Sequence, residues 1–310
     1  MPMGALTRRP RVWTLDGMQT LLEANSLAAG TPAEQMKAAA AAGADGLIVD
    51  GGPGEPDWKV WGKAAGEAAG PRVIGRIAVE LPQRGRPGRD WRRVFGLGER
   101  PEVILRVRST DNLDGAYREA ITVLEPMVSE LVRLGVHPIL EPAGTLARSR
   151  EVWFIREAME QAAGPDAISV AWRPLEPALP TDAPSVSIKR LIRSLELVII
   201  PPLPPEASRP KPVDGEGKAW MPLPQNGDDA AAVFVVEQLK GMLYDRMICL
   251  SRPRGSSAAV EWAGAVAELR AEWAKAPIPL SAYKGDKNAP KYAKPGTPST
   301  TGEPALGTST

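Results

Sequence analysis

Short apolar runs alternate with longer amphipathic segments along most of the chain. The apolar runs predict strands and the amphipathic segments predict helices between them. We expect strands at 12–15, 47–49, 73–80, 103–107, 139–141, 168–172, 197–200 and 247–250, and helices at 31–42, 57–69, 113–134, 151–163, 187–194, 228–241 and 257–273. Residues 17–29 fit either a helix or a loop. The alternation favours an α/β fold, a single closed (β/α)8 TIM barrel, over an open doubly wound sheet, and no GxGxxG motif supports dinucleotide binding.

The first clear helix and strand illustrate the repeating unit. Thr31 can cap a helix, and Glu34, three residues later, completes a capping box. Gly43 ends this helix, and the apolar run 47–49 then leads directly to Asp50. A helix followed at this spacing by a buried strand is typical of a parallel βαβ unit.

Two segments interrupt the alternation. Residues 201–227 are rich in proline and poor in apolar side chains, which predicts a long loop covering the barrel mouth. From Pro277 the chain consists mainly of Pro, Gly, Ser, Thr and Lys, as flexible tails do. We therefore expect a barrel domain at 1–276 and a flexible C-terminal tail at 277–310.

Composition excludes some classes of partner. The net charge is +1, so no overall field attracts nucleic acid or a membrane surface. The single cysteine, Cys249, lies in the apolar run MICL, where we expect a buried strand residue and not a nucleophile. The lack of a disulfide framework fits a reducing compartment. Because no apolar stretch is long enough to span a membrane, we expect a cytoplasmic protein.

The stretch GVHPILEPAG at 135–144 places a carboxylate at the carboxyl end of a predicted strand. Catalytic groups of (β/α)8 barrels lie at that end. This residue, Glu141, can serve as a catalytic base, as a ligand-binding group, or as the salt-bridge partner of an arginine. The only histidine in the chain, His137, begins the same strand, so we interpret it as structural.

Three arginines are predicted at the same end of the barrel, because each follows or ends a strand: Arg108, Arg173 and Arg252. Guanidinium groups bind phosphate or carboxylate through two parallel hydrogen bonds and keep their charge when buried. They are therefore candidates to bind an anionic small molecule. The alternative, which the sequence leaves open, is that they pair with the chain's own carboxylates at Asp50, Glu80 and Glu141.

A second group of arginines lies in the segment QRGRPGRDWRR, at positions Arg84, Arg86, Arg89, Arg92 and Arg93. A solvated loop is the ordinary explanation, but this density beside Trp91 also fits an acidic protein partner at the Arg84–Arg93 loop. Since the chain has no basic stripe elsewhere, general nucleic-acid binding is not expected. Five of the nine tryptophans fall on predicted helices, where they serve either core or interface: Trp58, Trp61, Trp153, Trp262 and Trp273.

Three segments carry a resemblance to a known family. They are AAAAAGADGLIVDGG, LVRLGVHPILEPAG and GEGKAWMPLPQNGDDAAAVFVVEQLKGMLYDRMICLSRP, in that order along the chain. Together they resemble the xylose-isomerase-like barrels of the sugar phosphate isomerase/epimerase superfamily over residues 31–273. The resemblance implies a TIM barrel with a divalent cation held by carboxylates and a histidine at its mouth.

Glu141 matches the first metal ligand that the resemblance implies. The other expected ligands are absent, because Arg173 stands at the second position, Ile200 followed by Pro201 at the third, and Ser251 at the fourth. An arginine beside a divalent ion would repel it and offers no lone pair. We therefore expect neither a metal nor another cofactor.

These observations predict a divergent barrel, a pseudoenzyme that has lost metal-dependent catalysis and acts as a binding or accessory subunit. One alternative is an active sugar or sugar-acid isomerase or epimerase, an intramolecular oxidoreductase that uses Glu141 as its base. A second alternative is a structural component of a larger assembly.

Overall fold

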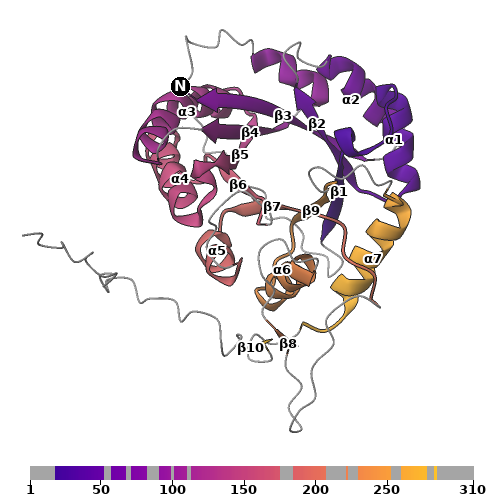
Figure 1. Cartoon of the computed structure of the whole chain (residues 1–310). Helices are drawn as coiled ribbons and strands as arrows, with labels where there is room; N and C mark the ends of the chain where they lie inside the picture. Colours follow the sequence, from indigo (N-terminus) through magenta and orange to yellow (C-terminus); the bar gives the residue numbers. More distant parts are fainter. Residues whose placement is uncertain are drawn as a thin grey trace, which may run out of the picture.

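The computed structural model describes residues 18–51, 57–67, 71–81, 91–98, 101–109, 113–174, 184–206, 221–222, 230–252, 260–277 and 283–284. Eight parallel strands close into a barrel in the order β1-β2-β3-β4-β5-β6-β7-β9 (Figure 1). They are β1 (Gln19–Glu23), β2 (Gly46–Gly51), β3 (Arg72–Leu81), β4 (Glu102–Ser109), β5 (His137–Gly144), β6 (Ser169–Trp172), β7 (Leu195–Ile200) and β9 (Met247–Leu250). The predicted fold class, an α/β TIM barrel, is confirmed.

Helices surround the barrel (Figure 1). The α-helices are α1 (Pro32–Ala41), α2 (Trp58–Glu67), α3 (Leu113–Arg133), α4 (Ser149–Ala163), α5 (Pro184–Leu191), α6 (Ala230–Gly241) and α7 (Trp262–Ala274). Three short 3-10 helices are η1 (Ala24–Ser26), η2 (Trp91–Leu97) and η3 (Thr145–Ala147). In the part of the β3 to β4 connection that the structure describes, η2 takes the place of an α-helix. Within the described residues, no helix has the length and apolarity that crossing a membrane requires.

The first barrel strand lies later than the sequence predicts. Residues 12–15 fall outside the described ranges, whereas β1 lies inside the segment 17–29 that fitted a helix or a loop. Leu21 packs inside the barrel and Leu22 packs toward the helices, so both are buried. Because both faces of the strand are covered, its sequence lacks the polar and apolar alternation that identifies a half-exposed strand.

Two helix predictions can be compared with the structure. The capping box at the start of α1 is confirmed, since the Glu34 backbone N–H donates to Thr31 Oγ1 at 3.3 Å and the Thr31 N–H donates to the Glu34 carboxylate at 2.7 Å. The helix predicted at 113–134 is also confirmed, since α3 continues through Pro126 to Arg133.

Side chains inside the barrel form three layers. The middle layer is apolar and consists of Leu21, Ile48, Ile74, Ile104, Ile139, Ala171, Leu197, Ile199, Met247 and Cys249. At the amino ends of the strands, Arg72 pairs with Glu102 at 2.5 Å, and His137 Nε2 lies 3.0 Å from Ser169 Oγ. The third layer, at the carboxyl ends, is ionic and forms the candidate site.

A short parallel pair joins two segments that were predicted to be irregular. Strand β8 (Met221–Pro222) falls in the predicted loop 201–227, and it pairs with β10 (Tyr283–Lys284) in the predicted tail 277–310. Residues 207–220 and 285–310 lie outside the described ranges. The boundary near residue 276 therefore stays a prediction.

Helix α2 and η2 pack with their backbones in direct contact. A Cβ added at Gly62 would lie 1.9 Å from the carbonyl oxygen of Gly96. Gly62→Ala is therefore expected to lower the free energy of unfolding by about 1–3 kcal/mol, because η2 must move off α2. Gly66→Ala, on the same helix with no atom near the added Cβ, is expected to leave stability unchanged or raise it by up to about 1 kcal/mol. Urea unfolding of both variants measures the difference, and equal effects would contradict the packing argument.

Candidate functional site

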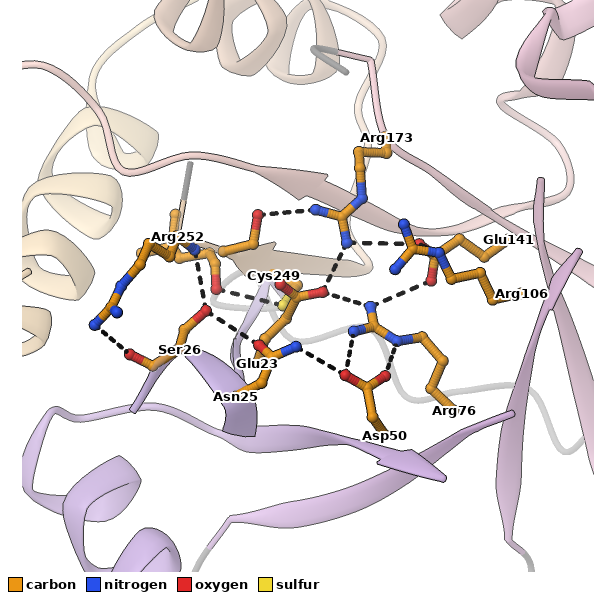
Figure 2. A network of polar contacts seen from close by, with 12 residues as sticks. Glu23, Asn25, Ser26, Asp50, Arg76, Arg106, Glu141, Arg173, Cys249 and Arg252 are labelled. Carbon is orange, nitrogen blue, oxygen red and sulfur yellow. Dashed lines mark hydrogen bonds and ion pairs between the residues drawn. The ribbon is translucent and has the colours of Figure 1, made fainter. Parts of the chain in front are cut away.

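An ionic layer fills the carboxyl end of the barrel (Figure 2). It contains three carboxylates and three guanidinium groups from six different strands or strand ends: Glu23, Asp50, Glu141, Arg76, Arg106 and Arg173. Three negative charges meet three positive charges, so the layer has no net charge. The arrangement supports the possibility, left open by the sequence, that arginines pair with the chain's own carboxylates.

Arg76 is the centre of this layer. Its side chain is 2% exposed, and its guanidinium donates to all three carboxylates. Nε and Nη2 bind Asp50 at 2.5 and 3.0 Å, as adjacent strands in register allow, while Nη1 binds Glu23 and lies 3.4 Å from Glu141. Asn25 donates a further hydrogen bond to Asp50 at 2.8 Å.

Arg173 is the second guanidinium group of the layer that contacts more than one carboxylate. Its Nη2 donates to Glu23 at 2.7 Å and lies 3.5 Å from Glu141, while its Nη1 donates to the hydroxyl of Ser251 at 3.0 Å. One guanidinium thus joins the ends of β1, β5 and β9. Arg173 and Glu141 lie close together, as predicted, but they contact each other and do not line an open site.

Glu141 is enclosed by guanidinium groups. Its side chain is 1% exposed, and Arg76, Arg106 and Arg173 approach its carboxylate oxygens at 3.4, 3.4 and 3.5 Å. Of the three roles that the sequence allowed, this geometry corresponds to the salt-bridge partner.

Two groups of the layer, Glu23 and Arg76, favour each other's charged form. Burial alone would raise the pKa of Glu23, but Arg76 and Arg173 outweigh it, and the pKa lies below its ordinary value. Burial alone would likewise lower the pKa of Arg76, but Glu141, Asp50 and Glu23 raise it well above its ordinary value. Each group therefore stabilises the charged form of its partners.

The other two predicted arginines do not join this cluster. Arg108 is exposed at the end of β4, in register with exposed Glu80, and neither side chain has an ion pair among the described residues. Arg252 is half-buried after β9, where its Nη2 donates to the carbonyl oxygen of Ser26 at 3.1 Å. Figure 2 shows Arg252 and Arg106 on opposite sides of the network. The three arginines predicted together are thus separated, and Arg76 and Arg106 take part instead.

The chain contains one histidine and one cysteine, and both have structural surroundings. His137 lies at the amino end of β5, beside Ser169 and away from the mouth. Cys249 is fully buried in the apolar layer, and burial raises the pKa of its thiol well above the ordinary value. These positions agree with the structural interpretation of both residues.

Among the described residues at the mouth, exposed side chains lie on β2, β3 and β4. The Asp50 side chain is 42% exposed, and Ala78, Glu80 and Arg108 are exposed as well. Glu141, Ala143 and Ser251 are buried. A ligand that approaches over β3 and β4 would therefore meet Glu80 and Arg108 before it met Glu141.

The sequence matches no family model and no curated protein. Solved structures do match. D-psicose 3-epimerase from Clostridium cellulolyticum H10, solved with D-tagatose, has a TM-score of 0.53 and 12% identity over 83% of this chain and 96% of its own. For 3-keto-D-glucoside 4-epimerase from E. coli the TM-score is 0.56, with 14% identity over 82% and 99%. A xylose isomerase domain protein from Salmonella typhimurium LT2 gives 0.55, with 11% identity over 83% and 97%.

The chain has the xylose-isomerase-like TIM-barrel fold. The family resemblance drawn from the sequence is confirmed at the level of fold, which is what likenesses at these identities establish. The xylose-isomerase-like barrel also brings together three of the four positions at which metal ligands were expected, since Arg173 donates to Ser251 and lies 3.5 Å from Glu141.

The residues at these positions do not fit a divalent cation. Of the four, Glu141 alone carries a carboxylate, Ile200 is a buried apolar residue, and Arg173 offers no lone pair. Within the described ranges, no three His, Cys, Asp or Glu side chains are grouped so as to hold a metal ion. In this xylose-isomerase-like barrel the guanidinium of Arg173 contacts Glu141 and Ser251, two of the positions at which metal ligands were expected.

Sequence reasoning missed Glu23, Arg76 and Arg106. Arg76 and Arg106 lie inside apolar strands, two positions after the interior residues Ile74 and Ile104. Because side chains of a strand alternate between its faces, this spacing is the signal that both arginines point into the barrel. The signal becomes usable only when the interior face of each strand is known.

Proposed function

We propose that this barrel binds a small anionic ligand at its mouth without a divalent metal, and that it has lost metal-dependent sugar isomerisation. The loss of metal-dependent chemistry is inferred from the position of Arg173, which donates to Glu23 and Ser251 and faces Glu141. The structural neighbours named above are sugar epimerases or carry a xylose isomerase domain, so a sugar-derived anion is the ligand class that fits best.

Electrostatics argue against a metal at this position. A dication about 4 Å from a guanidinium is repelled by roughly 8 kcal/mol at an effective dielectric constant of 20. Three guanidinium groups already neutralise the three carboxylates of the layer. A metal would therefore have to displace arginines that are tightly held.

The geometry gives little support to Glu141 as a catalytic base. A base must come within hydrogen-bond distance of the proton that it removes. Glu141 is buried beneath Arg76, Arg106 and Arg173, so a substrate would have to break these contacts to reach it. An active isomerase built on Glu141 is thus the weaker alternative.

The ligand contact that we propose is Arg108, because Arg252 is held at another strand end by its hydrogen bond to the carbonyl oxygen of Ser26. Arg108 is exposed and has no ion pair among the described residues, so its guanidinium can bind phosphate or carboxylate bidentately. Arg173, which the sequence also suggested, is already engaged by Glu23 and Ser251.

Elemental analysis of purified protein tests the metal-free part of the proposal. We expect no stoichiometric zinc, manganese or magnesium, because Arg173, Ile200 and Ser251 stand where ligands would be needed. About one equivalent of metal that is lost in Glu141→Ala would contradict the proposal and restore the enzyme alternative.

Thermal shift with inorganic phosphate, sugar phosphates and sugar acids tests the ligand. A stabilising shift should disappear in Arg108→Ala and persist in Arg133→Ala, a matched change of an exposed arginine on α3. If no anion stabilises the wild type, or if Arg108→Ala responds as the wild type does, the proposed anion site is wrong.

A further inference from the structure

A second surface, which shares no residue with the ionic layer, lies on the outer ring where α2 meets η2. We call it the α2–η2 surface and define it by six exposed side chains: Lys59, Val60, Lys63, Arg92, Arg93 and Phe95. The surface includes the two arginines of the Arg84–Arg93 loop that the structure describes. Residues 82–90, which contain the other three, lie outside the described ranges.

The two elements of this surface are fixed to each other. Besides the contact at Gly62, a Cβ added at Gly96 would lie 2.6 Å from the backbone nitrogen of Lys59. Both elements are also fixed to the barrel, because Trp58 and Leu97 pack over the bare Cα of Gly75 in β3. The α2–η2 surface is therefore a preformed platform, which reduces the entropy lost on binding.

Positive charge is concentrated at this platform. The described ranges that form it, 57–67 and 91–98, contain four basic side chains against the two acidic side chains of Asp57 and Glu67, a net charge of +2. The whole chain has a net charge of +1, so these nineteen residues are more basic than the chain as a whole. Such a local basic region favours binding of a compact acidic group.

The platform also exposes apolar area. Val60 is 46% exposed and Phe95 is 38% exposed, and the α2 turn that carries Val60 lies against the residue after Phe95. Aromatic and arginine side chains are enriched in protein interfaces, where an apolar centre is surrounded by charge. This combination indicates a protein partner more than a solvated loop.

We infer that the α2–η2 surface binds an acidic segment of another protein, with carboxylates on its lysines and arginines and an apolar side chain against Val60 and Phe95. An extended nucleic acid would leave the two apolar side chains without an apolar partner, and a net charge of +2 over the described ranges is small for adsorption to an anionic membrane. The inference rests on charge, exposure and packing at the outer ring. It is independent of the ligand proposed for the mouth.

The test uses the full-length protein and a fluorescent random copolymer of glutamate and tyrosine at low salt. The copolymer should bind more tightly than polyglutamate, since it supplies apolar contacts as well as charge. Val60→Ser/Phe95→Ser should weaken binding about tenfold, and Arg92→Glu/Arg93→Glu should weaken it at least about tenfold. Arg92→Lys/Arg93→Lys keeps the charge and should retain most of the binding.

Matched control changes exist on the same chain. Val186 on α5 is 44% exposed and Phe154 on α4 is 38% exposed, so Val186→Ser/Phe154→Ser removes similar apolar area elsewhere. Circular dichroism checks that each variant is folded. The inference is overturned if the copolymer does not bind, or if the control variant loses as much binding as Val60→Ser/Phe95→Ser. Tighter binding of a DNA oligonucleotide or of phosphatidylserine vesicles through the same residues would equally overturn it.

Discussion

Replacing Arg76 with methionine is expected to lower the free energy of unfolding by about 3–5 kcal/mol, the usual effect of removing one partner from a buried ion pair. Methionine fills much of the same volume but leaves Glu23, Asp50 and Glu141 without their common donor. Chemical denaturation at neutral pH measures the loss. Arg133→Met, which removes an exposed arginine from a 3.9 Å pair, should change stability by no more than about 0.5 kcal/mol.

The same comparison has a defined pH dependence. Glu23 has a lowered pKa in the folded protein, so its contribution to stability is present above the unfolded pKa of about 4.3 and is lost as the pH falls through the folded value. In Arg76→Met the Glu23 carboxylate lacks this stabilisation, and its protonation removes the cost of burying its charge. The difference between variant and wild type should therefore shrink in acid. A difference that stays constant from neutral pH to acid would contradict the ionic explanation.

Replacing Arg173 with alanine is expected to lower the free energy of unfolding by about 3 kcal/mol and to leave a space that accepts a small cation. The space is lined by Glu23, Glu141 and Ser251, the groups that Arg173 now contacts. Low concentrations of methylguanidinium should raise the melting temperature of Arg173→Ala, whereas they should only lower that of the wild type. Thermal unfolding with and without the cation measures both effects.

Arg173→Lys provides the companion variant. It keeps the charge, but an ammonium group cannot reach Glu23 and Ser251 with two fixed prongs, so we expect only part of the stability to return. An Arg173→Ala protein as stable as the wild type would show that the guanidinium is not needed to neutralise the carboxylates. In that case Arg173 would again be available as a ligand-binding residue.

Most of the barrel could be predicted because its strands are buried on both faces. Runs such as 103–107 and 247–250 stand out against the helices that flank them, and their order leaves few topologies. Strand β1 was not recognised, because its residues Gln19–Glu23 contain too few apolar side chains to form a recognisable run.

The candidate site was predictable only where a residue ends a strand. Glu141 and Arg173 could be placed at the mouth from their position alone, because carboxyl ends of parallel strands meet there. Arg76 lies within a ten-residue strand, and a single charge there is usually read as facing solvent. Its role depends on partners from β1, β2 and β5, which no local pattern of the sequence connects.

The ionic layer also affects when the barrel can be completed during folding. Arg76 and Glu141 are 65 residues apart along the chain, and Arg173 and Glu23 are 150 residues apart. Contacts at such separations form late, since the intervening chain must first be ordered. Interactions that are absent from the transition state slow unfolding and leave the folding rate largely unchanged. We therefore expect the salt bridges at the mouth to act mainly as a kinetic barrier to opening the barrel, and a nascent chain cannot add Arg173 to them until β6 has been synthesised.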